Sequence, residues 1–211
     1  MPSVILTYDN TDAGLGPYFN RCYLDLQPFL DALQQSAIIA LNGVSCTVEV
    51  IERHLDDLNG QPFIFIGISH GRSNALVASQ HEYISYANAH RFQNSLFYTY
   101  ACLTALELGP ELERIGCRGY LGYSSEVKTN VRFEDIFIKC KNAGIVYFLA
   151  GNRTLQETYD FMLANYEKEA KDLSEKDGSA FIAAAFLEGN AKALTMLGNR
   201  QLTLNDLTMN G

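Results

Sequence analysis

Two short apolar runs, each ending at a residue with reactive side-chain chemistry, constrain the fold of this chain most. Pro62–Ser69 is followed by His70 and Gly71, and Ser95–Ala101 is followed by Cys102. Runs of this length, rich in aromatic and β-branched residues, are typical of buried strands in a parallel sheet. In open parallel sheets, functional sites form at the carboxyl ends of the strands. If these two strands are neighbours, an imidazole and a thiol face one crevice. These are the two side chains that a cysteine peptidase needs at minimum.

Composition limits the class of protein and the kinds of partner. The chain has 211 residues, of which 47% are apolar, which predicts one domain over residues 1–211 with a sizeable core. Its net charge of −8 argues against nucleic acid or an anionic membrane as the main partner. No apolar run approaches the roughly 18 residues that span a bilayer. Met1 and Pro2 lead directly into a strand-like segment without a basic region, so we expect a cytoplasmic protein.

The cysteines predict neither disulfides nor a metal centre. There are five of them, an odd number, and no two form a C-x-x-C pair: Cys22, Cys46, Cys102, Cys117 and Cys140. This pattern disfavours a disulfide framework and a zinc site, and we expect free thiols, no metal and no cofactor. All except Cys102 lie in apolar or helical contexts, where free cysteine packs as a small hydrophobe.

The remaining pattern predicts strands that alternate with helices. Expected strands are Val4–Tyr8, Ser45–Glu52, Phe63–Ser69, Leu96–Ala101, Arg118–Tyr123 and an edge strand Ala193–Leu197, with a hairpin at 75–79 and 82–85. Expected helices are Tyr18–Leu41, Ala105–Ile115, Phe133–Ala150, Leu155–Lys171 and Ala180–Leu187, with Thr154 as an N-cap and a charged connector at Lys171–Gly178. This alternation indicates a layered α/β domain.

A serine hydrolase is one alternative reading of the first motif. Residues 67–71 match G-x-S-x-G, the nucleophile elbow that would make Ser69 the nucleophile. That mechanism needs an acid and then a histidine later in the chain. The four histidines are at positions 54, 70, 81 and 90, so more than half of the chain follows the last of them. The order of residues therefore disfavours this mechanism.

The pairing of Cys102 with His70 satisfies more of the chemical requirements. A thiol needs a nearby base or a positive dipole to become a thiolate. Cys102 closes a strand and is expected to open a helix, whose N-terminus favours negative charge. Gly71 lets the backbone approach a ligand and leaves its N–H free to point at an oxyanion. The alternative is that both residues are ordinary core residues at strand ends.

At these residues the chain resembles the caspase-like (clan CD) peptidases, and within them the CHAT subgroup. Ser69-His70-Gly71 and Tyr100–Ala105 are similar to the family's histidine and cysteine motifs. Asn74–Ser79 resembles the hairpin after the histidine, and Gly116–Tyr123 resembles the fifth strand. Phe148–Gly151 followed by Thr154–Thr158 is similar to a further family element. The resemblance covers about residues 62–171.

The resemblance implies a three-layer sandwich, with a mostly parallel central sheet and helices on both faces. It implies that Cys102 is the nucleophile and His70 the general acid/base of an endopeptidase. The N–H groups of Gly71 and Cys102 would form the oxyanion hole. The sequence departs from the family because it offers no obvious charged group to orient the imidazole. A catalytically silent scaffold that binds partners through the same cleft is the second hypothesis.

Two further expectations follow from the resemblance. In caspase-like folds, loops after the first and fifth strands build the pocket for the residue before the scissile bond. Here these loops carry Asp9, Asp12 and Glu126, which predicts a basic residue at that place, with an apolar one as the alternative. A regulatory protein partner, self-cleavage or dimerisation is expected to activate the enzyme on its protein or peptide substrate. The candidate switching loops are Asp9–Gly16, Glu126–Val131 and Lys171–Gly178.

Overall fold

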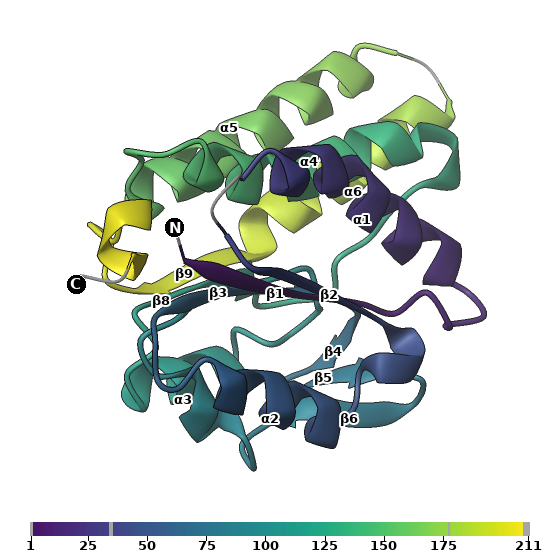
Figure 1. Ribbon diagram of the computed structural model, residues 1–211. Coiled ribbons are helices and arrows are strands. Elements are labelled where there is room, and N and C mark those ends of the chain that lie inside the picture. Colours follow the sequence, from purple (N-terminus) through teal and green to yellow (C-terminus); the bar gives the residue numbers. More distant parts are fainter. Residues whose placement is uncertain (1, 34–35, 177, 209–211) are drawn as a thin grey trace.

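A mainly parallel six-stranded sheet forms the centre of the computed structural model, which describes residues 2–33, 36–176 and 178–208 (Figure 1). The strand order is β2-β1-β3-β7-β8-β9, and only β9 runs antiparallel to its neighbour. The bounds are Ser3–Tyr8 (β1), Ile38–Asn42 (β2), Phe63–Ile68 (β3), Leu96–Thr99 (β7), Gly119–Tyr123 (β8) and Leu194–Gly198 (β9). β1, β3 and β7 are buried along most or all of their length because helices cover both faces of the sheet.

Each face of the sheet has its own hydrophobic core. One face is covered by α1 (Gly16–Asp31), α4 (Glu134–Leu149), α5 (Leu155–Ser174) and α6 (Ser179–Ala193) (Figure 1). The other carries α2 (Val48–Asp57), α3 (Leu108–Arg114) and a small antiparallel sheet of β4 (His70–Arg72), β5 (Ala75–Ala78) and β6 (His81–Ser85). Short 3-10 helices lie at Gly43–Ser45, Ala89–Phe92, Val131–Phe133 and Leu204–Leu207. The expected three-layer arrangement is confirmed.

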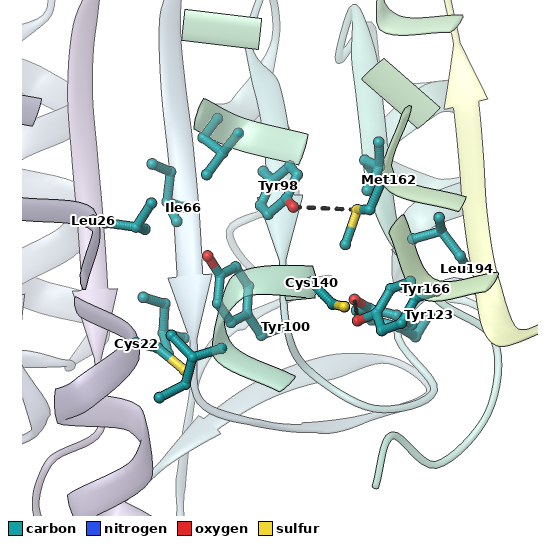
Figure 2. Close-up of a cluster of buried hydrophobic side chains, with 14 of the residues drawn as sticks. Cys22, Leu26, Ile66, Tyr98, Tyr100, Tyr123, Cys140, Met162, Tyr166 and Leu194 are labelled. Atoms are coloured by element: carbon teal, nitrogen blue, oxygen red, sulfur yellow. Dashed lines mark hydrogen bonds between the residues drawn. The ribbon is translucent and has the colours of Figure 1, made fainter. Parts of the chain in front are cut away.

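Tyrosines fill the core beneath α4 and α5, and their hydroxyls have partners there (Figure 2). The Tyr98 hydroxyl donates to the Lys141 carbonyl at 2.5 Å and lies 3.3 Å from the Met162 sulfur. The hydroxyls of Tyr123 and Tyr166 are 2.8 Å apart. A buried hydroxyl without a partner costs about 1–3 kcal/mol, so these pairs allow large polar rings to pack under the helices.

The predicted helix is confirmed from Tyr18 to Asp31, but the predictions for the segments that follow, up to residue 52, were wrong. The first helix ends at Asp31 instead of continuing to Leu41, and Ile38–Asn42 is strand β2, which pairs with β1. The predicted strand Ser45–Glu52 is instead a 3-10 turn followed by α2, because the Thr47 hydroxyl accepts from the Val50 N–H and caps that helix. Residues 34–35 of the predicted helix lie outside the described residues.

Other boundaries are closer to expectation. Thr154 caps α5 in a reciprocal capping box with Glu157, as predicted, and the edge strand β9 is confirmed. α5 continues to Ser174, so the connector predicted to start at Lys171 is shorter; its residue 177 lies outside the described part. No helix in the described ranges is long and apolar enough to cross a membrane.

Candidate active site

The strand register brings the His70 and Cys102 segments together at the carboxyl edge of the sheet. Gly67 of β3 pairs with Thr99 of β7, and His70 and Cys102 each follow three residues later. A Cβ atom on Gly71 would lie 2.4 Å from the Cys102 carbonyl oxygen. Only glycine tolerates an approach this close, so this residue lets the two strand ends meet.

Asp12, in the loop after β1, holds the imidazole of His70. The Asp12 Oδ2 atom lies 3.2 Å from His70 Nε2. The His70 ring also packs edge to face against the Phe19 ring, with 5.3 Å between the ring centres. The other carboxylate oxygen accepts from the N–H groups of Leu15 at 2.5 Å and Gly14 at 2.9 Å. These backbone hydrogen bonds, followed by the His70 imidazole, hold the pKa of Asp12 below its ordinary value, although partial burial opposes them.

Asp12 therefore supplies the charged orienter that the sequence seemed to lack. With Nε2 facing a carboxylate, the imidazole keeps its proton on that nitrogen, and Nδ1 is the nitrogen available to accept another. The sequence placed Asp12 among the residues of the substrate pocket. The structure places it against His70, at a hollow that both residues line.

The thiol of Cys102 contacts the backbone of the loop after β8. The Val127 N–H donates to Cys102 Sγ at 3.2 Å, and the Val127 carbonyl lies 3.9 Å from the same sulfur. Within the described ranges, no hydrogen bond joins Cys102 Sγ to His70. The expected helix N-terminus at Cys102 is also missing, since α3 begins only at Leu108. The backbone N–H of Val127, rather than a helix dipole, is the group in place to stabilise a thiolate.

The turn after Cys102 is strained. Leu103 has a φ of +65°, a left-handed conformation that costs a non-glycine residue about 1–2 kcal/mol. Its N–H donates to the Ser125 carbonyl at 3.2 Å, which ties the turn to the loop after β8. The N–H of Cys102 donates to no described residue. It is therefore available to a ligand at this edge of the sheet.

Hollows lie on both sides of this pair. One of about 240 Å³ is lined by residues on the histidine side, including Asp12, His70, Arg72 and Gln80. Another of about 620 Å³ lies between the loop after β8 and α6, and its lining includes Leu103, Glu126, Phe186 and Asn190. A third hollow of about 600 Å³ lies between α5 and α6 and shares no lining residue with the other two. An extended peptide could cross the strand ends from the first hollow to the second.

The two other predicted pocket carboxylates differ in setting. Asp9 is 1% exposed and accepts from Thr11 Oγ1 at 2.6 Å and from the Ser79 N–H at 3.1 Å. It therefore fastens the loop after β1 to the small sheet. Glu126 is exposed at the rim of the 620 Å³ hollow.

Ser69 of the alternative motif has no base within reach. It is 2% exposed, and its hydroxyl contacts the Tyr83 hydroxyl at 2.9 Å and the His70 carbonyl at 3.0 Å. In the described part of the chain, no histidine imidazole hydrogen-bonds to it. The hydroxyl is part of the core under the small sheet.

Two functional contacts could not be found by sequence reasoning, namely Asp12 with His70 and Val127 with Cys102. The first joins residues 58 positions apart and the second residues 25 apart, and both run through loops. The only available signal for the first was that Asp12 lies in the loop after the first strand, next to the strand that carries the histidine.

Comparison with known proteins identifies the fold. No protein-family model matches the sequence, and no curated protein matches it. A solved structure of gingipain R (RgpB), an Arg-specific cysteine proteinase, is 11% identical with a TM-score of 0.57, over 95% of this chain and 47% of that one. A complex of the pro- and mature domains of Porphyromonas gingivalis RgpB gives a TM-score of 0.59 at 11% identity, over 95% and 48%.

The chain spans about half the length of those two chains. At this level of identity the likeness concerns the fold. The mainly parallel sheet with helices on both faces is the arrangement that they share with this chain. The chain therefore has the caspase-like α/β fold of these cysteine proteinases.

Proposed function

We propose that this protein is a cysteine endopeptidase in which Cys102 is the nucleophile and His70 the general acid/base. The proposal rests on one observation: the ends of β3 and β7 bring the His70 and Cys102 segments together, and the Asp12 carboxylate lies against Nε2 of His70. The caspase-like fold of known cysteine proteinases supports it. Membership of the CHAT subgroup is part of the same proposal. Five unpaired thiols support a cytoplasmic location.

The proposed reaction follows from these positions. His70 Nδ1 takes the proton of the Cys102 thiol, and the thiolate attacks the carbonyl carbon of the peptide. The N–H groups of Gly71 and Cys102 donate to the oxyanion that forms. As the C–N bond breaks, the imidazolium returns the proton to the leaving amine, which leaves an acyl-enzyme. A water molecule, deprotonated by the imidazole, then hydrolyses the thioester and releases the acid product and the thiol.

Selective alkylation tests the nucleophile. We expect iodoacetamide to label Cys102 alone in the folded protein. The other thiols are 5% exposed or less, and burial raises their pKa to about 12 for Cys22, Cys46 and Cys140 and about 11 for Cys117. Peptide mapping by mass spectrometry measures the site, and His70→Ala should slow the reaction. Labelling at a rate that does not depend on His70 would favour the silent scaffold.

The position of Val127 favours regulation of the enzyme. The Val127 backbone contacts the Cys102 sulfur, and the backbone of the next residue, Lys128, is hydrogen-bonded to the side chain of Asn190 in α6. The Lys128 N–H donates to Asn190 Oδ1 at 2.9 Å, and Asn190 Nδ2 donates to the Lys128 carbonyl at 2.8 Å. We propose that the loop Glu126–Val131 restrains the thiol until a protein partner or processing displaces it. One structural neighbour is itself a complex of pro- and mature domains.

Loosening the clamp should raise reactivity. Asn190→Ala removes both hydrogen bonds to Lys128, and we expect Cys102 to be alkylated about 5–30 times faster, since the two bonds stabilise the loop by roughly 1–2 kcal/mol. Asn205→Ala, a surface substitution elsewhere in the chain, is the control and should leave the rate unchanged. The alkylation rate and the melting temperature are measured together. A slower rate in a variant that melts near the wild type would contradict the restraint.

A further inference from the structure

The hollow of about 620 Å³ lies on the far side of Cys102 from His70. His70 follows β3, Cys102 follows β7, and the loop that lines the hollow follows β8, which is the order of these strands in the sheet. The lining includes Leu103, the residue after Cys102, and both chain neighbours of Val127, whose backbone contacts the Cys102 sulfur. The hollow therefore begins beside the proposed nucleophile.

The proposed chemistry determines which part of a substrate reaches this hollow. The imidazole of His70 returns its proton to the leaving amine, so the residue after the scissile bond lies on the histidine side. The attacked carbonyl carbon lies at the Cys102 sulfur, and the side chain of the residue before the scissile bond branches from the next carbon atom. The side of Cys102 remote from His70 therefore receives this side chain.

Apolar groups form much of the wall of this hollow. Leu103 comes from the turn after the nucleophile, and Ala185, Phe186 and Gly189 come from α6. The α6 positions are three or four residues apart, so they share one face of the helix. None of these four residues belongs to the loop Glu126–Val131, so they remain in place when that loop leaves the thiol. A hollow with such walls suits an apolar side chain.

The polar groups of the hollow do not favour a charged side chain. Glu126 and Lys128 both line it, and their charges are opposite. The Lys128 ammonium lies over the Phe186 ring, 5.5 Å from its centre, so this ring already has a cation beside it. Both ends of the Asn190 amide are bonded to the Lys128 backbone. A basic side chain would meet the ammonium and an acidic one the carboxylate, whereas an apolar side chain leaves no polar group unpaired.

Gly189 keeps the hollow open. It lies in the interior of α6, where glycine stabilises a helix less than alanine does. In the described part of the chain, a Cβ atom at this position would meet no side chain or neighbouring element within 4 Å, so close packing does not require glycine there. A larger side chain at position 189 would therefore project into the hollow without displacing a neighbour.

We propose that this hollow binds a large apolar side chain, such as that of leucine, methionine or phenylalanine, immediately before the scissile bond. Leu103, Phe186 and Gly189 are the residues that determine this specificity. The inference rests on the proposed peptidase activity and gives its substrate class. It favours the apolar alternative over the basic residue expected from the loop carboxylates. Two of those three carboxylates are engaged by other groups, and the third shares the hollow with Lys128.

The test uses five peptidyl chloromethyl ketones that differ only in the last residue, Ala, Leu, Phe, Arg or Asp. The rate constant for modification of Cys102 is measured by intact mass and peptide mapping. Each rate is divided by that of the Ala probe, whose side chain is too short to fill the hollow. We expect a ratio of about 10–100 for the Leu and Phe probes and of about 1 for the Arg and Asp probes. Gly189→Phe should lower the Leu and Phe ratios to about 1–3, because the new ring occupies the hollow.

Matched variants separate loss of the hollow from loss of the fold. Glu188→Phe adds the same ring one residue earlier, at an exposed position that lines the hollow between α5 and α6, and should leave every ratio unchanged. Phe186→Ala removes part of the wall and should lower the Leu and Phe ratios by about 3–10-fold. Melting temperatures are measured for all variants. If Gly189→Phe melts well below the wild type, Ala185→Phe brings the same ring to the hollow from an exposed position one turn away.

The outcomes distinguish this inference from the proposed function. If no probe modifies Cys102, or if His70→Ala does not slow modification, the peptidase proposal fails and this inference fails with it. Where modification depends on His70, three results overturn the apolar pocket alone. These are an Arg or Asp probe that reacts fastest, five probes that react equally, and an apolar preference that survives the added ring at position 189 or 185.

Discussion

Replacing Cys102 by alanine is expected to abolish cleavage of a matched peptide, and replacing His70 by alanine is expected to lower kcat/KM by about 10³-fold or more. The two side chains act as one unit, since the thiolate forms only when the imidazole takes its proton. The double variant should therefore be hardly worse than either single variant. Steady-state assays with the activated protein measure all three. Equal, additive losses of about tenfold each would indicate binding roles rather than nucleophile and base.

Ser69→Ala is the control for these variants, because it tests the alternative nucleophile next to His70. We expect it to retain activity within about tenfold of the wild type. It should lose stability, by about 1–3 kcal/mol, since its hydroxyl pairs with Tyr83 in the core. If Ser69→Ala is inactive while Cys102→Ala still cleaves, the serine hydrolase mechanism is correct.

Asp12→Asn should lower kcat/KM by about 100-fold while the protein stays folded. The amide oxygen can still accept from Gly14 and Leu15, so the loop keeps its turn, but the charge that faces His70 Nε2 is lost. Without this carboxylate the ring is no longer held in one orientation and tautomer. In the proposed mechanism Asp12 is a positioning residue, because it acts through His70.

A pH–rate profile separates this role from a purely structural one. Hydrogen bonds from the loop backbone and the contact with His70 hold the pKa of Asp12 below its ordinary value, so it is a carboxylate throughout the neutral range. Its removal should therefore change the pH dependence of kcat/KM as well as its maximum, because the charge that faces the imidazole is lost. Any stability that Asp12 contributes is present above its ordinary pKa and is lost as pH falls further. Glu126→Gln, an exposed control in the loop after β8, should leave the profile unchanged. An unshifted profile in Asp12→Asn would mean that the carboxylate does not act on His70.

The sequence alone determined most of the buried parallel strands of this protein. Long apolar runs specify buried strands because only a sheet covered on both faces can bury them, and parallel strands end at one edge. That the strands before His70 and Cys102 are neighbours was implied by the family resemblance, and β3 and β7 do pair in the sheet. Thr154 was identified as a cap because capping depends on residues only three positions apart.

Local patterns were misleading where tertiary pairing decided the structure. Residues 38–52 are rich in apolar residues, and the alternation over Ser45–Glu52 suggested a strand there. The segment Ile38–Asn42 became a strand because β1 offered it an unpaired edge, while the cap at Thr47 started a helix. The intrinsic secondary-structure preference of so few residues stabilises a conformation less than the backbone hydrogen bonds of a strand pairing in a sheet.

Only the tertiary structure decided which partners the reactive residues have. Asp12 faces His70, Val127 contacts Cys102, and Phe186 lines a hollow with Leu103, although each comes from a distant part of the chain. Loops set the distances between these groups. The path of a loop depends on where the rest of the fold holds its ends and contacts it, and not only on the residues of the loop. The strands thus fixed which reactive side chains meet at this edge of the sheet, and the loops fixed which groups contact them.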